Sequence, residues 1–279
     1  MKITRKNFLK TITTGIAGSA LLGNYPLSAK TFTGERKLKF GIASYSFREF
    51  SLDDTIAMTD RLDIKYLGLK SMHMPLESST GQIKEMAARV RQSGIDLYGA
   101  GVVYMNNEKE VNNAFRYAQA AGLRVIIGVP NHELLPLVNE KVKEFDIKVA
   151  IHNHGPGDDK YSSPDDVYSL IKDLDRRIGL CLDIGHTFRI GQDPVVMLKK
   201  YRERLYDVHF KDVDKASAEG ENIECGRGVM DLPPVLAALM EVNYEGVVAL
   251  EYEKNGNDPL PGAAESIGYA NGILDSLTT

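Results

Sequence analysis

The sequence predicts a closed, eight-stranded parallel (β/α)8 barrel, or TIM barrel, that forms a single domain over residues 37–279. Short apolar, β-branched runs alternate eight times with longer segments of helical period. Most of these runs are almost continuously hydrophobic, as expected of parallel strands that are buried on both faces. Eight such units within about 240 residues suit this barrel, whose usual size is about 250 residues.

The predicted strands cover residues 38–43, 64–69, 95–102, 124–129, 148–152, 178–183, 205–210 and 247–252. Between them, apolar residues recur at helical spacing, for example over residues 80–92 and 108–121. The main alternative is an open, doubly wound sheet, which would favour a glycine-rich phosphate loop after its first strand. Here the first strand continues into Ser44-Tyr45-Ser46-Phe47-Arg48. The barrel is therefore the better interpretation.

Charge and cysteine content exclude several classes of function. The net charge is -4, whereas nucleic-acid binders usually carry a basic excess. We therefore expect no nucleic-acid partner. Cys181 and Cys225 form no paired-spacing motif, and Cys181 lies inside an apolar run, so we expect neither a disulfide nor a cysteine nucleophile.

Residues 1–30 have the layout of a cleavable export signal. A basic start is followed by the uncharged residues 11–23 and then by Pro26-Leu27-Ser28-Ala29. Residues 4–10 resemble a twin-arginine signal in which Lys6 replaces the second arginine. The apolar run is too short for a comfortable membrane span. We predict an exported, periplasmic protein with no stable span after cleavage; an uncleaved anchor or a plain N-terminal extension is the alternative.

All six histidines lie at or just after the C-terminal end of a predicted strand. They are His73, His132, His152, His154, His186 and His209. Active sites in this fold are built at that end of the barrel. Histidines with scattered structural roles would also occur on the helices, so their distribution predicts a site at the C-terminal mouth.

Strand parity selects among these residues, because alternate side chains face the barrel interior. His152 and His154 fall on one side of their strand, and His209 and Lys211 share a side of theirs. Two further apolar strands end in a carboxylate, and a buried carboxylate needs a partner. The predicted metal ligands are His152, Asp183, His209 and Glu251.

This mixed nitrogen and oxygen set suits zinc, manganese, cobalt or iron(II) better than calcium. Three or four ligands with an open position would make such a metal catalytic. The alternative is a network without metal, in which Asp183 and Glu251 pair with Lys211 or Arg227.

Five short motifs, in order, resemble the xylose-isomerase-like superfamily of sugar isomerases and epimerases, which also contains inosose dehydratase and an apurinic endonuclease. They are His-Asn-His-Gly (152–155), Leu-Asp-Ile-Gly-His (182–186), His-Phe-Lys-Asp (209–212), Gly-Arg-Gly (226–228) and Leu-Glu (250–251), within a resemblance that spans about residues 38–277. In that family a Glu, an Asp, a His and a second Glu typically hold the metal. The resemblance places these roles on His152, Asp183, His209 and Glu251.

His152 departs from the family pattern, because epimerases of this kind use a pair of glutamates on opposite faces of the substrate. The His-x-His strand is instead similar to that of the dehydratases. The resemblance implies removal of a proton next to a carbonyl through an enediolate that a metal stabilises. The candidate bases are Glu251, His154, His186 and Lys211. Lys211 has a second interpretation, in which it neutralises the enolate oxygen.

Residues that follow the first, second, third and seventh strands are candidate sugar contacts. They are Tyr45, Phe47, Lys70, His73, Tyr104 and Arg227. For the aromatic residues the alternative is packing at the barrel rim, and for Arg227 it is an ordinary turn.

Three functions follow from the sequence, all with a small-molecule carbohydrate as partner. The first is a divalent-metal-dependent sugar isomerase or epimerase, and the second is a lyase that performs β-elimination on a keto sugar or keto glycoside. The third is a non-catalytic sugar-binding protein. Export favours free or oxidised sugars over phosphorylated ones. A homo-oligomer is compatible with the sequence, and endonuclease activity is disfavoured by the acidic balance.

Overall fold

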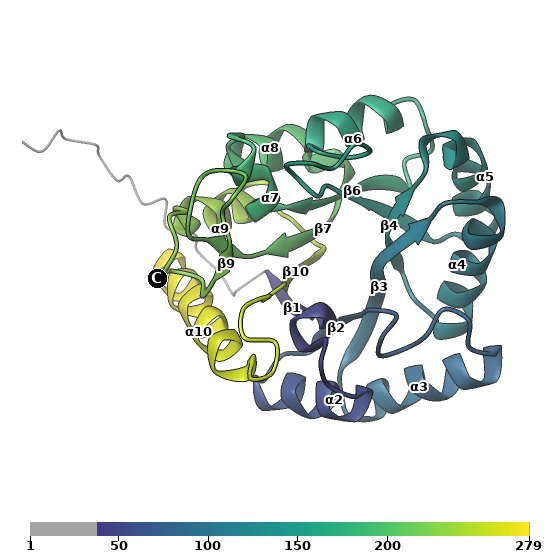
Figure 1. Cartoon of the computed structure of the whole chain (residues 1–279), viewed down its shortest axis with the longest axis horizontal. Coiled ribbons are helices and arrows are strands. Elements are labelled where there is room, and N and C mark those ends of the chain that lie inside the picture. The colour runs from purple at the N-terminus through teal and green to yellow at the C-terminus, as the bar shows by residue number, and fades with distance from the viewer. Residues whose placement is uncertain (1–37, 279) are drawn as a thin grey trace, which may run out of the picture. The chain divides into compact units, whose positions relative to one another are not determined.

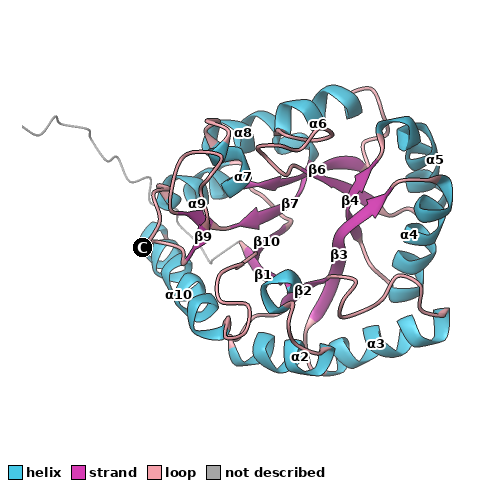
Figure 2. Ribbon diagram, viewed as in Figure 1, coloured by secondary structure: helices cyan, strands magenta, loops and turns pink. Residues whose placement is uncertain are grey.

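The computed structural model describes residues 38–278. Its strands form a closed parallel barrel in the order β1-β10-β7-β6-β5-β4-β3-β2. Figures 1 and 2 show the strands at the centre and the helices in a ring around them. The predicted fold class is confirmed. The predicted export signal at residues 1–30 lies outside the described residues.

The barrel strands are short and largely buried. They are β1 (Lys39–Ala43), β2 (Tyr66–Leu69), β3 (Asp96–Met105), β4 (Val125–Pro130), β5 (Lys148–His152), β6 (Ile178–Asp183), β7 (Leu205–Phe210) and β10 (Val247–Leu250). The strands β5, β6 and β7 begin and end at the predicted residues. The last strand ends two residues earlier than predicted, so Glu251 lies just beyond it.

The outer ring consists of helices that bury one face against the barrel. They are α2 (Leu52–Arg61), α3 (Thr80–Gln92), α4 (Glu108–Ala121), α5 (Leu135–Phe145), α6 (Pro164–Ile171), α7 (Ile184–Arg189), α8 (Pro194–Tyr201), α9 (Leu232–Glu241) and α10 (Leu260–Leu277), with short 3-10 turns η2 (Ser44–Phe47), η3 (His132–Leu134) and η4 (Arg202–Arg204). Ser51, Ser79 and Ser163 begin α2, α3 and α6 with capping boxes, which satisfy backbone N–H groups of the first turn. No helix within residues 38–278 has the length and apolarity needed to cross a membrane.

Strand register stacks the interior residues of β6 and β7 in layers. Cys181 pairs with Asp207, and two residues further on Asp183 pairs with His209. Ala249 of β10 also lies level with His209. Because side chains two residues apart share a face, Cys181 and Asp207 form the layer directly below Asp183 and His209.

A small hairpin and its loop stand beside the C-terminal mouth. Its strands β8 (Asp212–Val213) and β9 (Asn222–Ile223) are antiparallel. The Asp212 carboxylate accepts backbone N–H groups of Val213, Gly226, Gly228 and Met230, so one side chain fixes the path of the loop. A Cβ at Gly228 would lie 2.1 Å from Asp212 Oδ1, so the loop requires glycine there.

The same loop is tied to the segment that follows β10. Glu224 is buried and accepts hydrogen bonds from Tyr252 Oη at 2.7 Å and from Lys254 Nζ at 3.0 Å. Burial raises the pKa of Glu224, but these hydrogen bonds outweigh it and lower the pKa to about 2. Glu224 is therefore ionised at neutral pH and joins two segments of the mouth.

Candidate metal and active site

The four predicted metal ligands meet at the C-terminal mouth of the barrel. His152 ends β5, Asp183 ends β6, His209 lies near the end of β7, and Glu251 follows β10. One ligand atom from each of the four side chains lies within 4.8 Å of the other three, and all four side chains are buried. Four strands that are neighbours in the barrel therefore supply one cluster, as strand parity predicts.

Two nitrogen and two oxygen atoms face one another in this cluster. His209 Nδ1 lies 3.1 Å from His152 Nε2 and 3.2 Å from Glu251 Oε2. Asp183 Oδ2 lies 3.4 Å from His152 Nε2. Such spacings bring four donors within reach of a single ion.

The cluster fits a divalent metal by the chemistry of its donors. Asp183 Oδ1 accepts a hydrogen bond from the backbone N–H of His186 at 2.8 Å and so caps α7. Asp183 Oδ2 is buried and faces the other ligands; within residues 38–278 it has no well-aligned hydrogen bond, and its contact with Lys211 is an ion pair. Imidazole nitrogens combined with carboxylate oxygens suit zinc, manganese, cobalt or iron(II).

Lys211 is the cation that lies against these carboxylates. Its Nζ is 3.0 Å from Asp183 Oδ2, 2.8 Å from Glu251 Oε2 and 2.6 Å from Glu253 Oε1. Burial lowers the pKa of Lys211, but the three carboxylates outweigh it and hold the pKa well above its ordinary value. Lys211 is therefore an ammonium at neutral pH and a hydrogen-bond donor rather than a base.

His154 and His186 lie next to the cluster, on the side that is open to solvent. The His154 ring is 4.4 Å from the His152 ring and 6.1 Å from the His186 ring, centroid to centroid. Burial lowers the pKa of both His154 and His186. Both imidazoles are therefore neutral at pH 7, which leaves each of them able to accept a proton.

Three of the predicted sugar contacts lie at the rim of the mouth. Tyr104 is 48% exposed and its hydroxyl lies 3.2 Å from His154 Nε2. Lys70 Nζ lies 4.7 Å from the centre of the Tyr45 ring. Burial lowers the pKa of Lys70 more than the nearby carboxylates of Glu251 and Glu253 raise it, which places Lys70 within electrostatic reach of the cluster.

The structure does not bring the other three predicted sugar contacts to the site. Phe47 has no exposed surface, because the turn η2 directs it into the core. His73 is 3% exposed and lies between Ser44 Oγ and the Phe47 carbonyl, at 2.9 and 3.1 Å. Arg227 pairs with Glu265 of α10. In the structure the first two residues pack and Arg227 anchors its loop; a sugar contact by any of the three stays a prediction.

Three residues that contact the cluster or Lys211 were not predicted from the sequence. Asn153 accepts the Asp183 N–H at 3.0 Å and so fixes the end of β6. Glu253 binds Lys211, and Asp207 lies below His209. Parity was the available signal for Glu253 and Asp207, since each is two residues from a predicted ligand on the same strand or its continuation.

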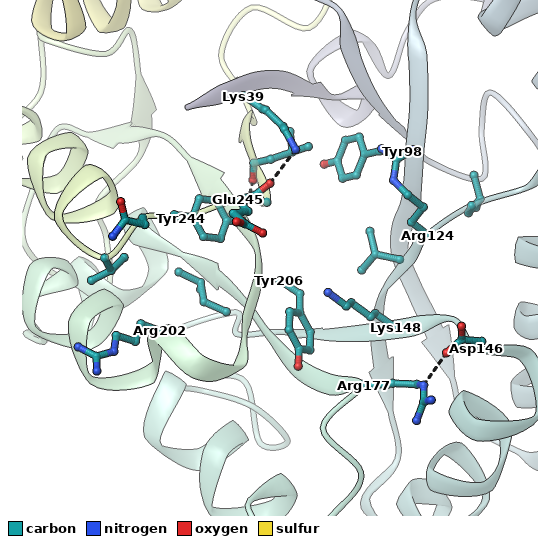
Figure 3. Close-up of a pocket in the computed structure, with 17 residues that line it drawn as sticks. Lys39, Tyr98, Arg124, Asp146, Lys148, Arg177, Arg202, Tyr206, Tyr244 and Glu245 are labelled. Atoms are coloured by element: carbon teal, nitrogen blue, oxygen red, sulfur yellow. Dashed lines mark hydrogen bonds and ion pairs between the residues drawn. The ribbon is translucent and has the colours of Figure 1, made fainter. Parts of the chain in front are cut away.

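A cavity of about 340 Å³ opens beside the cluster and is lined in part by His186, Lys211 and Glu253. A second cavity of about 700 Å³ lies at the opposite end of the barrel, where Lys39 and Lys148 begin their strands. Figure 3 shows its charged side chains: Lys39 Nζ donates a hydrogen bond to the Glu245 backbone carbonyl, and Arg177 pairs with Asp146. None of the predicted site residues lines this second cavity, so the candidate site is the one at the mouth.

Comparison with known proteins agrees with this geometry. The model of a family described as xylose isomerase-like TIM barrel matches residues 51–272. An inosose dehydratase of Lacticaseibacillus casei is 24% identical over 151 residues, which cover 49% of each chain. An inosose dehydratase of Clostridium tetani is 31% identical over 145 residues, which cover 46% of each chain. The chain spans about half the length of the curated relatives it matches.

Solved structures show the same fold over most of the chain. The IolI protein with a binding zinc atom has a TM-score of 0.72 at 15% identity and covers 87% of this chain and 100% of its own. A protein of Parabacteroides distasonis has a TM-score of 0.67 at 23% identity and covers 85% of this chain and 99% of its own. At these identities the likeness concerns the fold.

Proposed function

Because the chain belongs to the family of xylose isomerase-like TIM barrels, we propose that it is a metal-dependent lyase that eliminates water or an alcohol from a keto sugar or keto glycoside. The observation that carries this proposal is the pair of neutral imidazoles, His154 and His186, beside a cluster that contains a single glutamate, Glu251. Its relatives named inosose dehydratase support the same outcome.

The proposed ligands are His152, Asp183, His209 and Glu251. When bound there, a divalent metal would act as a Lewis acid on the carbonyl oxygen of the substrate and so acidify the neighbouring C–H. Lys211 adds a positive charge at the same place, because its ammonium lies against Asp183 and Glu251. A preorganised charge of this kind stabilises the negative charge that develops on the oxygen.

The elimination needs one base and one acid. His154 removes the proton next to the carbonyl, and the electrons of the broken C–H bond form the enolate. The carbonyl then re-forms, the bond to the β-oxygen breaks, and the electrons of that bond leave with the oxygen. The proton that His154 has taken up passes through His186 to the departing oxygen, so the leaving group is water or an alcohol and both imidazoles end neutral. The product is an unsaturated ketone.

The sequence-based first choice, an isomerase or epimerase, begins with the same proton removal and differs in returning a proton to carbon. An epimerase of the two-glutamate kind would need a second carboxylate where this chain has His152, whose Nε2 lies among the ligands. Elimination requires no base on that face. The expected export of the chain favours unphosphorylated substrates.

Incubation of the metal-loaded protein with a panel of keto sugars and keto glycosides in deuterated water tests the proposal. We expect loss of water or of an aglycone, detected by mass spectrometry and NMR, in the native protein and not after chelation. Deuterium gain without loss of any group would instead indicate isomerisation or epimerisation. Binding of a sugar without exchange at any carbon would contradict both reactions and favour a non-catalytic role.

A further inference from the structure

Asp207 is a buried carboxylate in a layer of the barrel that is ordinarily apolar. Interior layers of this fold are dominated by branched aliphatic residues, yet Asp207 has no exposed surface. Its polar neighbours include Cys181 Sγ at 3.6 Å, His209 Nε2 at 3.8 Å and the Tyr98 hydroxyl, and no lysine or arginine within residues 38–278 pairs with it. A buried charge without a cation is costly, so its presence calls for a physical reason.

The His209 ring joins this layer to the metal ligands above it. Its Nδ1 faces His152 Nε2 at 3.1 Å and Glu251 Oε2 at 3.2 Å, while its Nε2 faces the Asp207 carboxylate. A neutral imidazole carries one proton on one of its two nitrogens. Nδ1 can offer a lone pair to an ion only when the proton is on Nε2.

We propose that Asp207 is a positioning residue that keeps the proton of His209 on Nε2 and thereby directs the Nδ1 lone pair to the metal. The inference rests on the metal site of the proposed function. Strand register supports it, because the pair Cys181 and Asp207 lies directly below the pair Asp183 and His209. The two groups lie at an ion-pair distance of 3.8 Å, longer than a hydrogen bond. A carboxylate that receives the second N–H of a ligating histidine typically contributes about 10–100-fold in metal affinity.

The same layer provides a matched control. Tyr98 is buried on β3, and burial together with the Asp207 carboxylate raises the pKa of its hydroxyl. Tyr98→Phe therefore alters a neighbour of Asp207 and keeps the His209 ring and the metal ligands unchanged. Cys181 is unsuitable for this purpose, because its Sγ lies within 4.8 Å of ring nitrogens of His152 and His209. If Asp207 acted only through packing or through the polarity of its layer, Tyr98→Phe would behave like Asp207→Asn.

The first measurement is the dissociation constant for Co²⁺, obtained by competition with a chromophoric chelator, together with the visible spectrum of the bound Co²⁺. We expect Asp207→Asn to bind Co²⁺ about 10–100-fold more weakly and to shift the spectrum. Tyr98→Phe should stay within about threefold of the native protein, well below the effect of losing such a carboxylate. Native-like affinity in Asp207→Asn, or an equal loss in Tyr98→Phe, would overturn the proposal.

The second measurement needs no variant at position 207 and so holds even if Asp207→Asn does not fold. The full chain with ¹⁵N-labelled histidine is loaded with ¹¹³Cd²⁺ and examined by NMR. We expect ¹⁵N–¹¹³Cd coupling at Nδ1 of His209 and a proton on its Nε2; coordination through Nε2 would refute the inference. Cadmium binding in this form without turnover of any keto sugar would contradict the proposed lyase alone, whereas absence of metal binding would overturn both.

Discussion

Replacement of Lys211 by methionine tests the electrostatics of the mouth most directly. Asp183 has no exposed surface, Glu251 is 6% exposed, and the Lys211 ammonium lies within 3.0 Å of both. Removal of one partner from a buried ion pair typically costs about 3–5 kcal/mol, because the other charge stays buried and unpaired. For a domain of this size, each kcal/mol lowers the melting temperature by about 2–4 °C, so the metal-free variant should melt about 6–20 °C below the native protein.

The assay is urea and thermal unfolding of both proteins after chelation, and again with excess Mn²⁺ or Zn²⁺. A dication bound to the two carboxylates replaces the missing positive charge, so we expect metal to stabilise the variant more than the native protein. Lys200→Met is the matched control, because Lys200 pairs with Asp165 where both side chains are exposed, and surface pairs contribute little. Equal stability of the chelated native and Lys211→Met proteins would refute the reasoning.

Three further predictions concern the proposed base, the mouth and the barrel wall. His154→Gln should lower the rate of carbon-bound deuterium exchange by about 10²–10⁴-fold, and an unchanged rate would exclude His154 as the base. The pKa of Glu224 is lowered to about 2 when folded, so its contribution is present above its ordinary pKa of 4.5 and is lost as the pH falls towards 2. Glu224→Gln should therefore be less stable than the native protein by about 1–2 kcal/mol at pH 7, and the two unfolding midpoints should converge near pH 2; a constant difference would contradict this. A Cβ at Gly179 would lie 2.1 Å from the Arg204 carbonyl oxygen, whereas one at Gly268 of α10 meets nothing within 4 Å; urea unfolding should show that Gly179→Ala loses about 1–3 kcal/mol and that Gly268→Ala gains up to about 1 kcal/mol, and the opposite order would count against the packing argument.

Periodicity alone predicted the elements whose patterns are unbroken. The helices α3 and α4 and the strands β5, β6 and β7 have the predicted bounds, because each combines a continuous pattern with a clear capping residue or a polar end. The sequence predicted the end of β3 three residues too early. Tyr104, in the run 103–105, is exposed, and this polar-ended residue interrupts the apolar pattern that marks a buried strand.

The candidate ligands were predictable because parity decides direction inside a strand. The rule still holds where the chain continues in the direction of its strand, as at Glu251 after β10. In turns and loops it fails, and the sequence there does not reveal where a side chain points. Phe47 lies in the turn η2, which directs its side chain into the core. Arg227 pairs with Glu265, a carboxylate on a helix 38 residues away in sequence. Asp207 was missed for a different reason: a carboxylate one layer below the mouth contradicts the usual apolar composition of a barrel.

The order of strands around the barrel also governs when the cluster can form. Glu251 follows β10, which pairs with β1 about two hundred residues earlier in the chain and with β7 on its other side. Contacts between residues so far apart in sequence form late in folding, because closing the long loop between them costs conformational entropy before the contacts stabilise the chain. A chain whose last strand has not yet joined the barrel has three of the four donors in place, so tight metal uptake would distinguish molecules with a docked β10 from incompletely folded ones.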